Sequence, residues 1–504
     1  MRRRIDKPAS ARFWGTFALV ALAGVALAID LATGHRYGFH RDELATLDDS
    51  RHLAWGYVAY PPVTPFFGWI SLHWFGTSLT GFRFFAALAD ATAVVLTGLM
   101  ARDLGGNRGA QLVAASAAIP FSVAAGMLMQ YVSFDYLAWI ACSYFLICLC
   151  RSNDPRWWLA IGAAIGFGML TKYSMVVCAG AIIVGVLLSH LRRYLRSPWL
   201  WIGAGLSALI FLPNFFWQLK HDFISLDFLR HIHERDVRIG RTKDFLPDQL
   251  LLTLFSAPLA ILGLCFYFVS RTGRRFRAAG WLYVFPFLFF LIAKGRGYYL
   301  APAYPVLYAG GCVFGEQIIS TLSRGCRVAV GTATGIAIFA NFTLVCAFFV
   351  PVAPIESSWA QRILKSNDDL REEIGWEEMV ATVAQIRDSL GSEDHTQLGI
   401  LTGNYGEAGA INLYGERYGL PQAICGTNSF WARGYGDPPP ETLIVLGFSR
   451  EYLERHFESC ELAGQVTNRF SIANEEAKQH SDIFVCRRLR GTWPEFWKTF
   501  RRYG

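Results

Sequence analysis

The sequence predicts a polytopic α-helical membrane protein that carries a C-terminal α/β soluble domain. Of its 504 residues, 53% are hydrophobic and only 17% are charged, a composition too apolar for a large soluble enzyme. Uncharged runs close to the spanning length of about 20 residues recur up to Val350. From about Ala353 onward the composition becomes that of a soluble domain.

The apolar runs predict about eleven membrane spans. Their approximate bounds are 13–33, 79–101, 109–128, 135–150, 157–171, 174–190, 198–217, 250–270, 278–293, 298–315 and 328–350. Basic residues gather in alternate connections, beginning with Arg2, Arg3, Arg4 and Lys7, which is the positive-inside pattern. This pattern places the N-terminus in the cytoplasm and the C-terminal domain outside it. The first run lacks a convincing small-residue cleavage site, so we expect a retained helix.

Composition also excludes several functions. The net charge of +8 comes from the connections between apolar runs, so it reports topology and not a nucleic-acid surface. The signatures of nucleotide hydrolysis, Rossmann chemistry and structural zinc sites are missing. Three of the eleven cysteines lie in the polar C-terminal third, where an oxidising compartment could pair two of them. They are Cys425, Cys460 and Cys486, and the sequence does not choose the pair.

The predicted outer loop 35–78 concentrates ionisable groups where the chain leaves a span. Asp42 to Ala54 predicts a short amphipathic helix, and Val63 to Phe75 predicts a second interfacial segment. Of the adjacent acids Asp42 and Glu43, one could accept a proton from an incoming hydroxyl while the other orients a ligand or binds a cation. The alternative is an ordinary solvated connector between two helices.

Other outer segments are expected to converge with this loop on one face. They carry Asp135, Lys172, Lys294 and Arg296, and Arg83 lies near the outer end of its span. Each cation alone could be a snorkelling anchor. Together these charges suit a ligand that is both phosphorylated and hydroxyl-rich.

The polar C-terminal third predicts a small α/β domain. Asp368 to Leu390 has helical periodicity, while Leu398 to Leu401, Thr442 to Gly447 and Asp482 to Cys486 have the pattern of short buried strands. We therefore expect a transmembrane domain at 1–352 and an extracytoplasmic, or periplasmic, domain at 353–504.

The order of several motifs resembles that of bacterial glycosyltransferase family 39 proteins, which include relatives of protein mannosyltransferases and of the lipid A aminoarabinose transferase. The motifs are RDEL at 41–44, RHLAWGY at 51–57, LTKY at 170–173, KGRGYYLAPAYP at 294–305, NYGEA at 404–408 and GTNSFW at 426–431. The similarity covers nearly the whole chain.

This resemblance implies a GT-C type membrane fold and an inverting sugar transfer at the outer face of the bacterial inner membrane. The donor would be a polyprenyl-phosphate sugar, in bacteria undecaprenyl phosphate, and the acceptor a hydroxyl of a lipid, glycan or protein of the cell envelope. Asp42 would be the catalytic base, with Glu43 beside it. The donor phosphate would be held by Lys172, Lys294, Arg296 and Arg83. Substrate contacts are expected from Arg41, Tyr173, Tyr298, Tyr299, Asn404 and Glu407.

The resemblance leaves metal dependence open. Asp135 matches a position that helps to bind a divalent cation (Mg, Mn or Zn) in relatives. However, Ala59 and Tyr60 stand before Pro61-Pro62, where relatives often have an acidic residue and a histidine or lysine. This departure weakens the case for a metal.

Two other functions fit the sequence. One is a transporter or flippase that moves polyprenyl-linked sugars without chemistry, and it predicts functional charges through the depth of the bundle. The other is a non-catalytic envelope assembly protein whose soluble domain is the working part. The charges are concentrated on the predicted outer side, which favours the transferase.

Overall fold

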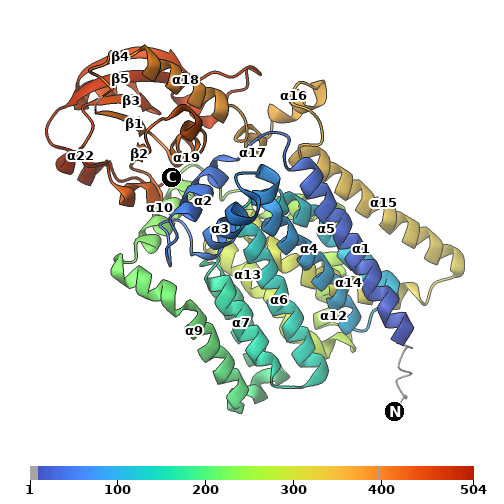
Figure 1. Cartoon of the computed structure of the whole chain (residues 1–504). Helices are drawn as coiled ribbons and strands as arrows, with labels where there is room; N and C mark the ends of the chain where they lie inside the picture. The colour runs from blue at the N-terminus through green and yellow to red at the C-terminus, as the bar shows by residue number, and fades with distance from the viewer. Residues whose placement is uncertain (1–8, 396) are drawn as a thin grey trace. The chain divides into compact units, whose positions relative to one another are not determined.

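The computed structural model of the chain describes residues 9–395 and 397–504. The chain forms two compact units, each assembled from separate stretches of sequence (Figure 1). A helical unit contains α1 (Ala9–Thr33) together with Arg83–His221 and His233–Val350. A mixed unit contains Gly34–Phe82, Asp222–Ile232 and Pro351–Gly504. The division at residue 352 stays a prediction, and the basic residues Arg2, Arg3, Arg4 and Lys7 lie outside the described residues.

The helical unit consists of long apolar helices joined by short turns (Figure 1). Its α-helices after α1 are α4 (Leu79–Asp103), α5 (Arg108–Gly126), α6 (Tyr131–Ser152), α7 (Trp157–Met169), α8 (Met175–Leu187), α9 (Pro198–Lys220), α11 (Phe245–Thr253), α12 (Ala257–Phe268), α13 (Arg277–Ile292), α14 (Tyr304–Ile319) and α15 (Arg324–Phe349). Its 3-10 helices are η1 (His190–Arg196), η2 (Leu254–Ser256), η3 (Gly273–Phe276) and η4 (Gly297–Ala303). Two helices have residues in both units: α4, whose first residues up to Phe82 belong to the mixed unit, and α10 (Ile224–Arg238).

The helical unit has the dimensions and composition of a multi-pass membrane protein. Among the described residues, eight helical stretches are long and apolar enough to cross a membrane, or nine if the bent pair Met175–Leu187 and His190–Arg196 is one span. Two of the predicted runs form the shorter helices α7 and α14. The multi-pass character is therefore confirmed, while the number of eleven spans stays a prediction.

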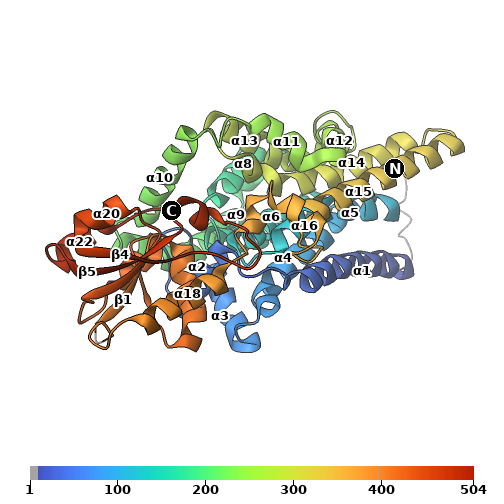
Figure 2. The same ribbon diagram turned by 90° about the horizontal axis from the view of Figure 1, so that it is seen from above.

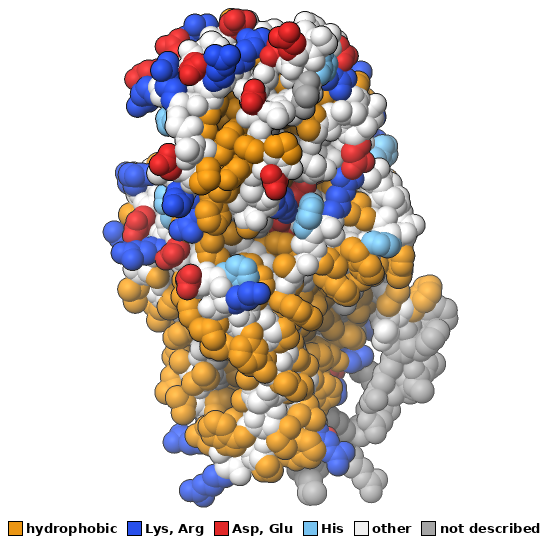
Figure 3. All heavy atoms as spheres, turned by 60° about the vertical axis from the view of Figure 1, so that its left-hand side comes forward, with side chains coloured by type: hydrophobic (Ala, Val, Ile, Leu, Met, Phe, Trp, Pro, Cys, Tyr) orange, Lys and Arg blue, Asp and Glu red, His pale blue; other side chains and the backbone are white. Residues whose placement is uncertain are grey.

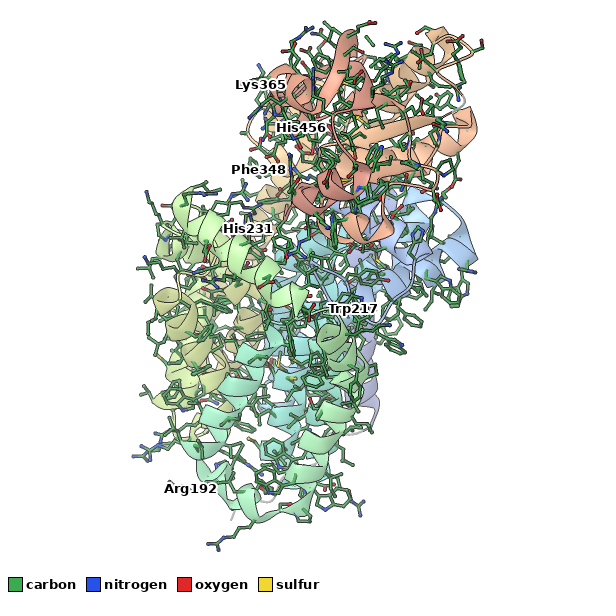
Figure 4. All side chains as sticks on the ribbon, turned by 90° about the vertical axis from the view of Figure 1, so that its left-hand side faces the viewer. Arg192, Trp217, His231, Phe348, Lys365 and His456 are labelled. Carbon is green, nitrogen blue, oxygen red and sulfur yellow. A yellow bond between two sulfur atoms is a disulfide. The ribbon has the colours of Figure 1, made fainter. Side chains whose placement is uncertain are left out.

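The surface of the helical unit shows the same character. Apolar side chains cover its sides, and arginine and lysine side chains gather at its lower end in Figure 3. Arg192 lies at this end, whereas Trp217 lies well toward the other end of α9 (Figure 4). In contrast, α14 is buried from Tyr304 to Val313, so it forms part of the core.

Small residues bring some of these helices into backbone contact. A Cβ at Gly162 of α7 would lie only 2.0 Å from the carbonyl oxygen of Gly203 in α9. Between α12 and α14, a Cβ at Gly311 would lie 1.9 Å from the Leu259 carbonyl oxygen. Close approach at small residues is a common way for helices to pack in membranes, because apolar side chains gain little by leaving lipid.

The mixed unit contains a five-stranded sheet with the order β2-β1-β3-β5-β4. The strands are β1 (Leu398–Thr402), β2 (Ala423–Cys425), β3 (Thr442–Leu446), β4 (Phe457–Gln465) and β5 (Asp482–Leu489). The first three are parallel, and the last two are antiparallel to their neighbours. Cys460 and Cys486 face each other in the β4–β5 register and form a disulfide. Cys425 is buried and free, so the structure resolves the pairing that the sequence left open.

Helices cover both faces of this sheet (Figure 2). The strands, α20 (Arg450–His456) and α22 (Trp493–Phe500) share one apolar core, which includes Phe457, Phe496 and Phe500. The helix α18 (Trp376–Ser389) packs on β3 and β4, and α19 (Tyr405–Tyr414) packs on β1 and β2. The remaining helices of this unit are α2 (Arg41–Arg51), α3 (Val63–Phe75), α16 (Ser358–Leu364), α17 (Asp368–Arg371), α21 (Glu475–Gln479), η5 (Gly415–Tyr418) and η6 (Asn428–Arg433).

The structure corrects one predicted helix. The helical periodicity from Asp368 to Leu390 belongs to two helices, α17 and α18, and not to one. The break is at Gly375, whose φ of +94° suits glycine and ends the continuous helix. Two strands, β2 and β4, and the helix α10 were not predicted.

Helices α2 and α19 cross at glycines. A Cβ at Gly409 of α19 would lie 2.7 Å from the backbone carbonyl carbon and oxygen of Leu44 in α2. Similarly, a Cβ at Gly406 would lie 3.0 Å from the Arg41 Cβ. The glycines thus allow α2 to lie directly against the helix that carries the NYGEA motif.

We expect Gly409→Ala to destabilise the mixed unit by about 1–3 kcal/mol, the usual cost of overpacking. The new methyl group would overlap backbone atoms that cannot move independently, and this outweighs the higher helix propensity of alanine, which is worth about 1 kcal/mol. Thermal unfolding in detergent measures the effect. Gly391→Ala is the matched control, because a Cβ there meets nothing within 4 Å. An unfolding temperature that rises in Gly409→Ala would show that the helices do not meet at this point.

Candidate active site

The first turn of α2 holds Asp42 and Glu43 in different environments. The Glu43 side chain is fully buried and accepts the His40 backbone N–H at 2.9 Å, which completes a capping box at the start of α2. The Asp42 side chain is 43% exposed. Its Oδ1 accepts the Tyr405 hydroxyl at 2.7 Å. Glu43 therefore has the contacts of a helix cap, while Asp42 is oriented and also open to a ligand.

Arg41, which precedes this pair, lies close to Tyr405 and to two glutamates of α21. Its guanidinium carbon is 4.9 Å from the centre of the Tyr405 ring. Its Nη1 lies 2.5 Å from Glu475 Oε2 and 3.4 Å from Glu476 Oε1. Burial, and to a smaller extent the charge of Asp42, raises the pKa of Tyr405 well above its usual value. The Tyr405 hydroxyl therefore stays protonated and donates to Asp42.

Buried carboxylates surround the start of α19. Asn404 accepts the Glu407 N–H at 3.0 Å, and Glu407 Oε2 accepts the Gly403 N–H at 2.9 Å and the Asn404 N–H at 3.3 Å. Burial, and to a smaller extent the charge of Glu476, raises the pKa of Glu407 to about 8. The same two causes raise the pKa of Glu372 to about 8. Asn404 and Glu407 thus cap the start of α19. Their contacts with a substrate stay predictions.

These raised pKa values predict how stability depends on pH. The folded state holds the Glu407 proton more tightly than the unfolded chain does, so the stabilisation is complete below the ordinary pKa of 4.5 and is lost as the pH rises toward 8. The slope is at most about 1.4 kcal/mol per pH unit for each such group. We expect the unfolding temperature to fall from pH 5 to about pH 8, and Glu407→Gln to make this fall shallower.

Glu451→Gln is the control for this measurement, because the Glu451 side chain is 86% exposed. Thermal unfolding of the full chain over a pH series provides the readout. Equal slopes in the wild type and in Glu407→Gln would contradict a protonated, buried Glu407.

Two adjacent buried acids, Asp48 and Asp49, fix the C-terminal half of α2. Arg433 contacts Asp48 and also donates to Asp49 Oδ1 at 2.5 Å. Asn412 Nδ2 donates to Asp48 Oδ1 at 2.7 Å, and the Tyr60 hydroxyl donates to Asp49 Oδ2 at 2.7 Å. Tyr60 is therefore a hydrogen-bond donor that helps to position α2.

In the helical unit, Lys172 lies near residues of two other segments, the start of α6 and η4. Its Nζ lies 3.9 Å from Asp135 Oδ2. The same Nζ lies 5.1, 5.3 and 4.7 Å from the ring centres of Tyr131, Tyr298 and Tyr299. The sequence predicted that these turns meet on one face, and this convergence within the helical unit is observed.

Neighbouring side chains hold this arrangement in place. The Tyr173 hydroxyl donates to Asn214 Oδ1 at 3.2 Å and accepts from Gln218 Nε2 at 2.6 Å, so it ties the Lys172 turn to α9. Both Nε and Nη2 of Arg296 lie 2.5 Å from Asp236 Oδ2. Asp236 is a buried partner that the sequence did not suggest.

The remaining predicted cations have contrasting positions. Lys294 is exposed, and its φ of +51° places it in the left-handed turn that ends α13. Arg83 is buried near the start of α4. The structure thus brings Lys172 and Asp135 together, places Arg296 against Asp236, and leaves the phosphate-binding roles of Lys294 and Arg83 as predictions.

Asp135 is the predicted metal ligand. Its Oδ1 is buried without a hydrogen-bond partner, so it has capacity for a further contact. However, the described residues contain no group of three or more His, Cys, Asp and Glu side chains that could hold a metal ion. The residues described do not by themselves make a complete divalent-cation site.

Sequence reasoning missed several residues of the α2 environment. Asp49 follows Asp42 by seven residues, which places both on one side of a helix, and this spacing was a usable signal. Arg433 and Asn412 are too distant in sequence for any such pattern to link them to Asp48. Tyr405 lies inside the NYGEA motif, but the motif did not show which side chain it contacts.

Comparison with known proteins finds similarity to membrane glycosyltransferases. Residues 59–217 match the family model described as dolichyl-phosphate-mannose-protein mannosyltransferase. The chain is 27% identical over 271 residues to the undecaprenyl phosphate-α-4-amino-4-deoxy-L-arabinose arabinosyl transferase 1 of Pseudomonas fluorescens, covering 50% of this chain and 48% of that protein. It is 28% identical over 209 residues to the lipopolysaccharide core galacturonosyltransferase RgtB of Rhizobium johnstonii, covering 40% of this chain and 41% of that protein. These matches span about half the length of the curated relatives or less.

Solved structures share the fold over more of the chain. ArnT from Cupriavidus metallidurans bound to undecaprenyl phosphate has a TM-score of 0.58 at 16% identity, covering 94% of this chain and 98% of that one. The oligosaccharyltransferase of Archaeoglobus fulgidus has a TM-score of 0.53 at 12% identity, covering 86% of this chain and 68% of that one. These findings confirm the predicted GT-C type fold and the resemblance to glycosyltransferase family 39.

Proposed function

We propose that this family 39-like chain is a glycosyltransferase that moves a sugar from a polyprenyl-phosphate donor to a hydroxyl of a lipid, glycan or protein acceptor. The reaction inverts the anomeric centre, and Asp42 is its general base. The enzyme lies in the bacterial inner membrane with its N-terminus in the cytoplasm and its mixed unit outside. The positive-inside pattern of the connections supports this orientation.

The assignment of Asp42 as the base rests on the exposure of its side chain. A base must lie within hydrogen-bond reach of the hydroxyl that it deprotonates. The other acids of α2, which are Glu43, Asp48 and Asp49, are buried. Asp42 alone among the acids of this helix combines a 43% exposed side chain with a fixed orientation, which the Tyr405 hydroxyl provides.

The chemistry of the proposed transfer requires both a base and a cation. The acceptor oxygen attacks the anomeric carbon, and the bond from that carbon to the phosphate oxygen breaks. The acceptor proton passes to Asp42, and the bonding electrons stay with the polyprenyl phosphate. The leaving phosphate gains negative charge, so a cation that is already in place stabilises it.

Lys172 is our choice for this cation. Asp135 and three tyrosine rings hold its ammonium group, and its side chain is still 17% exposed. Weak cation–π contacts leave N–H donors that a phosphate can use. We assign Arg296, Lys294 and Arg83 to the same phosphate as supporting cations, and Arg41, Tyr298 and Tyr299 to the sugar.

The names of the relatives support the substrate classes. The Pseudomonas fluorescens protein is an arabinosyl transferase named for an undecaprenyl phosphate donor. RgtB is named for transfer to lipopolysaccharide core. We therefore propose undecaprenyl phosphate as the donor lipid and an envelope glycolipid as the first acceptor to test. A divalent cation remains a separate proposal, and no step above depends on it.

Mass spectrometry of envelope glycans and glycolipids tests the proposal. Deletion of the gene should remove one sugar from one envelope component and leave the unmodified acceptor, and the wild-type gene should restore it. An unchanged glycolipid and glycoprotein profile after deletion would contradict the assignment. Accumulation of the intact donor lipid without any released polyprenyl phosphate distinguishes a transfer defect from loss of donor synthesis.

A further inference from the structure

The mixed unit contains a large polar cavity that the proposed chemistry does not use. Its volume is about 770 Å³, which is within the range of about 300–1,000 Å³ that is typical of ligand sites. We call it the Tyr–Arg cleft after the side chains that line it. Its lining includes Tyr37, Tyr414, Arg417, Tyr418, Arg469 and Phe470.

Aromatic rings and guanidinium groups are paired in the Tyr–Arg cleft. The Arg417 guanidinium lies 5.2 Å from the centre of the Tyr414 ring and 5.3 Å from that of Tyr418. The Arg469 guanidinium lies 4.7 Å from the centre of the Phe470 ring. The tyrosine and phenylalanine rings are half-buried, so each keeps an accessible part. Apolar ring faces beside polar groups suit a ligand with both C–H faces and hydroxyls, as sugars have.

Ion pairs on the wall supply acceptors as well as donors. Arg417 Nη2 lies 3.1 Å from Glu377 Oε2, and Arg469 Nε lies 3.6 Å from Glu378 Oε1. Exposed pairs of this kind contribute little to stability. Their carboxylate and guanidinium groups can instead hydrogen-bond to hydroxyl groups.

The wall of the cleft is partly rigid. Arg387 Nη1 of α18 donates to the Tyr418 carbonyl oxygen at 2.8 Å and fixes the end of η5. Glu373 and Trp376 on the opposite segment are buried. A preformed wall lowers the cost of ordering a ligand site.

The charges that line the cleft are nearly balanced. Four lining residues are acidic, namely Glu356, Glu373, Glu377 and Glu378. Three are arginines, namely Arg36, Arg417 and Arg469, and one is His35. With a neutral histidine the lining is slightly acidic, so a phosphate or uronic acid group gains no net attraction.

We propose that the Tyr–Arg cleft binds a hydroxyl-rich oligosaccharide that has no net negative charge. The further statement that this oligosaccharide is the glycan part of the acceptor rests on the proposed function. The binding of a glycan in the cleft does not. Gly38 lines the cleft and precedes α2, so the same short segment links the cleft to the helix that carries Asp42.

Binding of defined tetrasaccharides to the full chain in detergent tests this proposal. The probes are maltotetraose, which is neutral, chitosan tetrasaccharide, which carries amines, and tetragalacturonic acid, which is anionic. Isothermal titration calorimetry or saturation-transfer NMR gives the dissociation constants. We expect the neutral or the amine-bearing probe to bind at least about tenfold more tightly than the anionic probe, a difference of about 1.4 kcal/mol.

Two variants locate the binding. Arg417→Gln and Tyr418→Ala should each weaken binding of the preferred probe by about tenfold, and thermal unfolding confirms that both are folded. Arg450→Gln is the matched control, because Arg450 also forms an exposed ion pair, with Glu454 at 3.5 Å, and lies over the Phe484 ring. The control should bind like the wild type.

Three results would overturn the proposal: no binding of any probe, tightest binding of the anionic probe, or unchanged binding in both cleft variants. Asp42→Asn separates this proposal from the transferase. If that variant loses transfer and still binds the glycan, both proposals stand. If it transfers sugar normally while the cleft variants lose glycan binding, only the assignment of Asp42 fails.

Discussion

Asp42→Asn is expected to lower the rate of sugar transfer by about 10²–10⁴-fold, the usual contribution of a general base. Asparagine is nearly the same size and can still accept the Tyr405 hydroxyl, so α2 should keep its position. The amide cannot take up the acceptor proton. The measurement is kcat with a polyprenyl-phosphate sugar and acceptor in proteoliposomes, together with thermal unfolding.

Asp369→Asn provides the matched control for this loss. Asp369 is also an aspartate in the first turn of a helix, α17, and it is exposed. It should leave the rate unchanged. Tyr405→Phe should have an intermediate effect, because it removes the hydroxyl that orients Asp42 and leaves the base in place. Full activity in a folded Asp42→Asn protein would rule out the proposed base.

Lys172→Gln is expected to weaken binding of the donor by about 10- to 100-fold, because a hydrogen bond to a charged group contributes about 1.5–3 kcal/mol. The Lys172 ammonium is the centre of the cluster with Asp135 and the three tyrosines, so its loss also leaves Asp135 without its ion pair. Titration with polyprenyl phosphate, followed by tyrosine and tryptophan fluorescence, measures this loss.

The control for Lys172→Gln is Lys220→Gln. Lys220 ends α9 and is exposed, so the loss of its charge should not change donor affinity. Arg could replace Lys172 and keep the charge, and Lys172→Arg should therefore recover part of the affinity. If Lys172→Gln binds polyprenyl phosphate as tightly as the wild type does, other cations must hold the phosphate.

Much of the membrane architecture followed from hydropathy. Long apolar runs can satisfy backbone polar groups in lipid only as helices, so their pattern is direct evidence of spans. The segment from Val63 to Phe75 became α3 with the expected bounds. Two departures have different reasons. The helix α10 is polar on average and carries its apolar residues on one face, so overall hydropathy does not reveal it. The strand β4 has mostly exposed side chains, so it has no strong apolar pattern.

The candidate site was predictable only in part. The sequence placed Lys172, Asp135 and the Tyr298-Tyr299 pair in turns on one side, because the order of the spans determines the side on which each turn lies. It did not predict that Asp236 pairs with Arg296, because this contact joins residues 60 positions apart. The same holds for Arg433 and the Asp48-Asp49 pair.

Helix capping accounts for the observed contacts of two motif residues. Glu43 and Glu407 each occupy the third position of a helix and accept backbone N–H groups in capping boxes. A short polar motif before an apolar helix can signal either a cap or a binding site. The exposed fraction of each side chain, which sequence does not give, separates Asp42 from Glu43.

Release of polyprenyl phosphate is the most direct test of the central claim, which is that the protein breaks the bond between sugar and phosphate. Purified protein in liposomes, given a radiolabelled polyprenyl-phosphate sugar and an envelope glycolipid fraction, should release one polyprenyl phosphate for each sugar that appears on the acceptor. Asp42→Asn should abolish both. Donor that moves between leaflets with its sugar still attached, and with no polyprenyl phosphate released, would contradict the claim and identify a flippase.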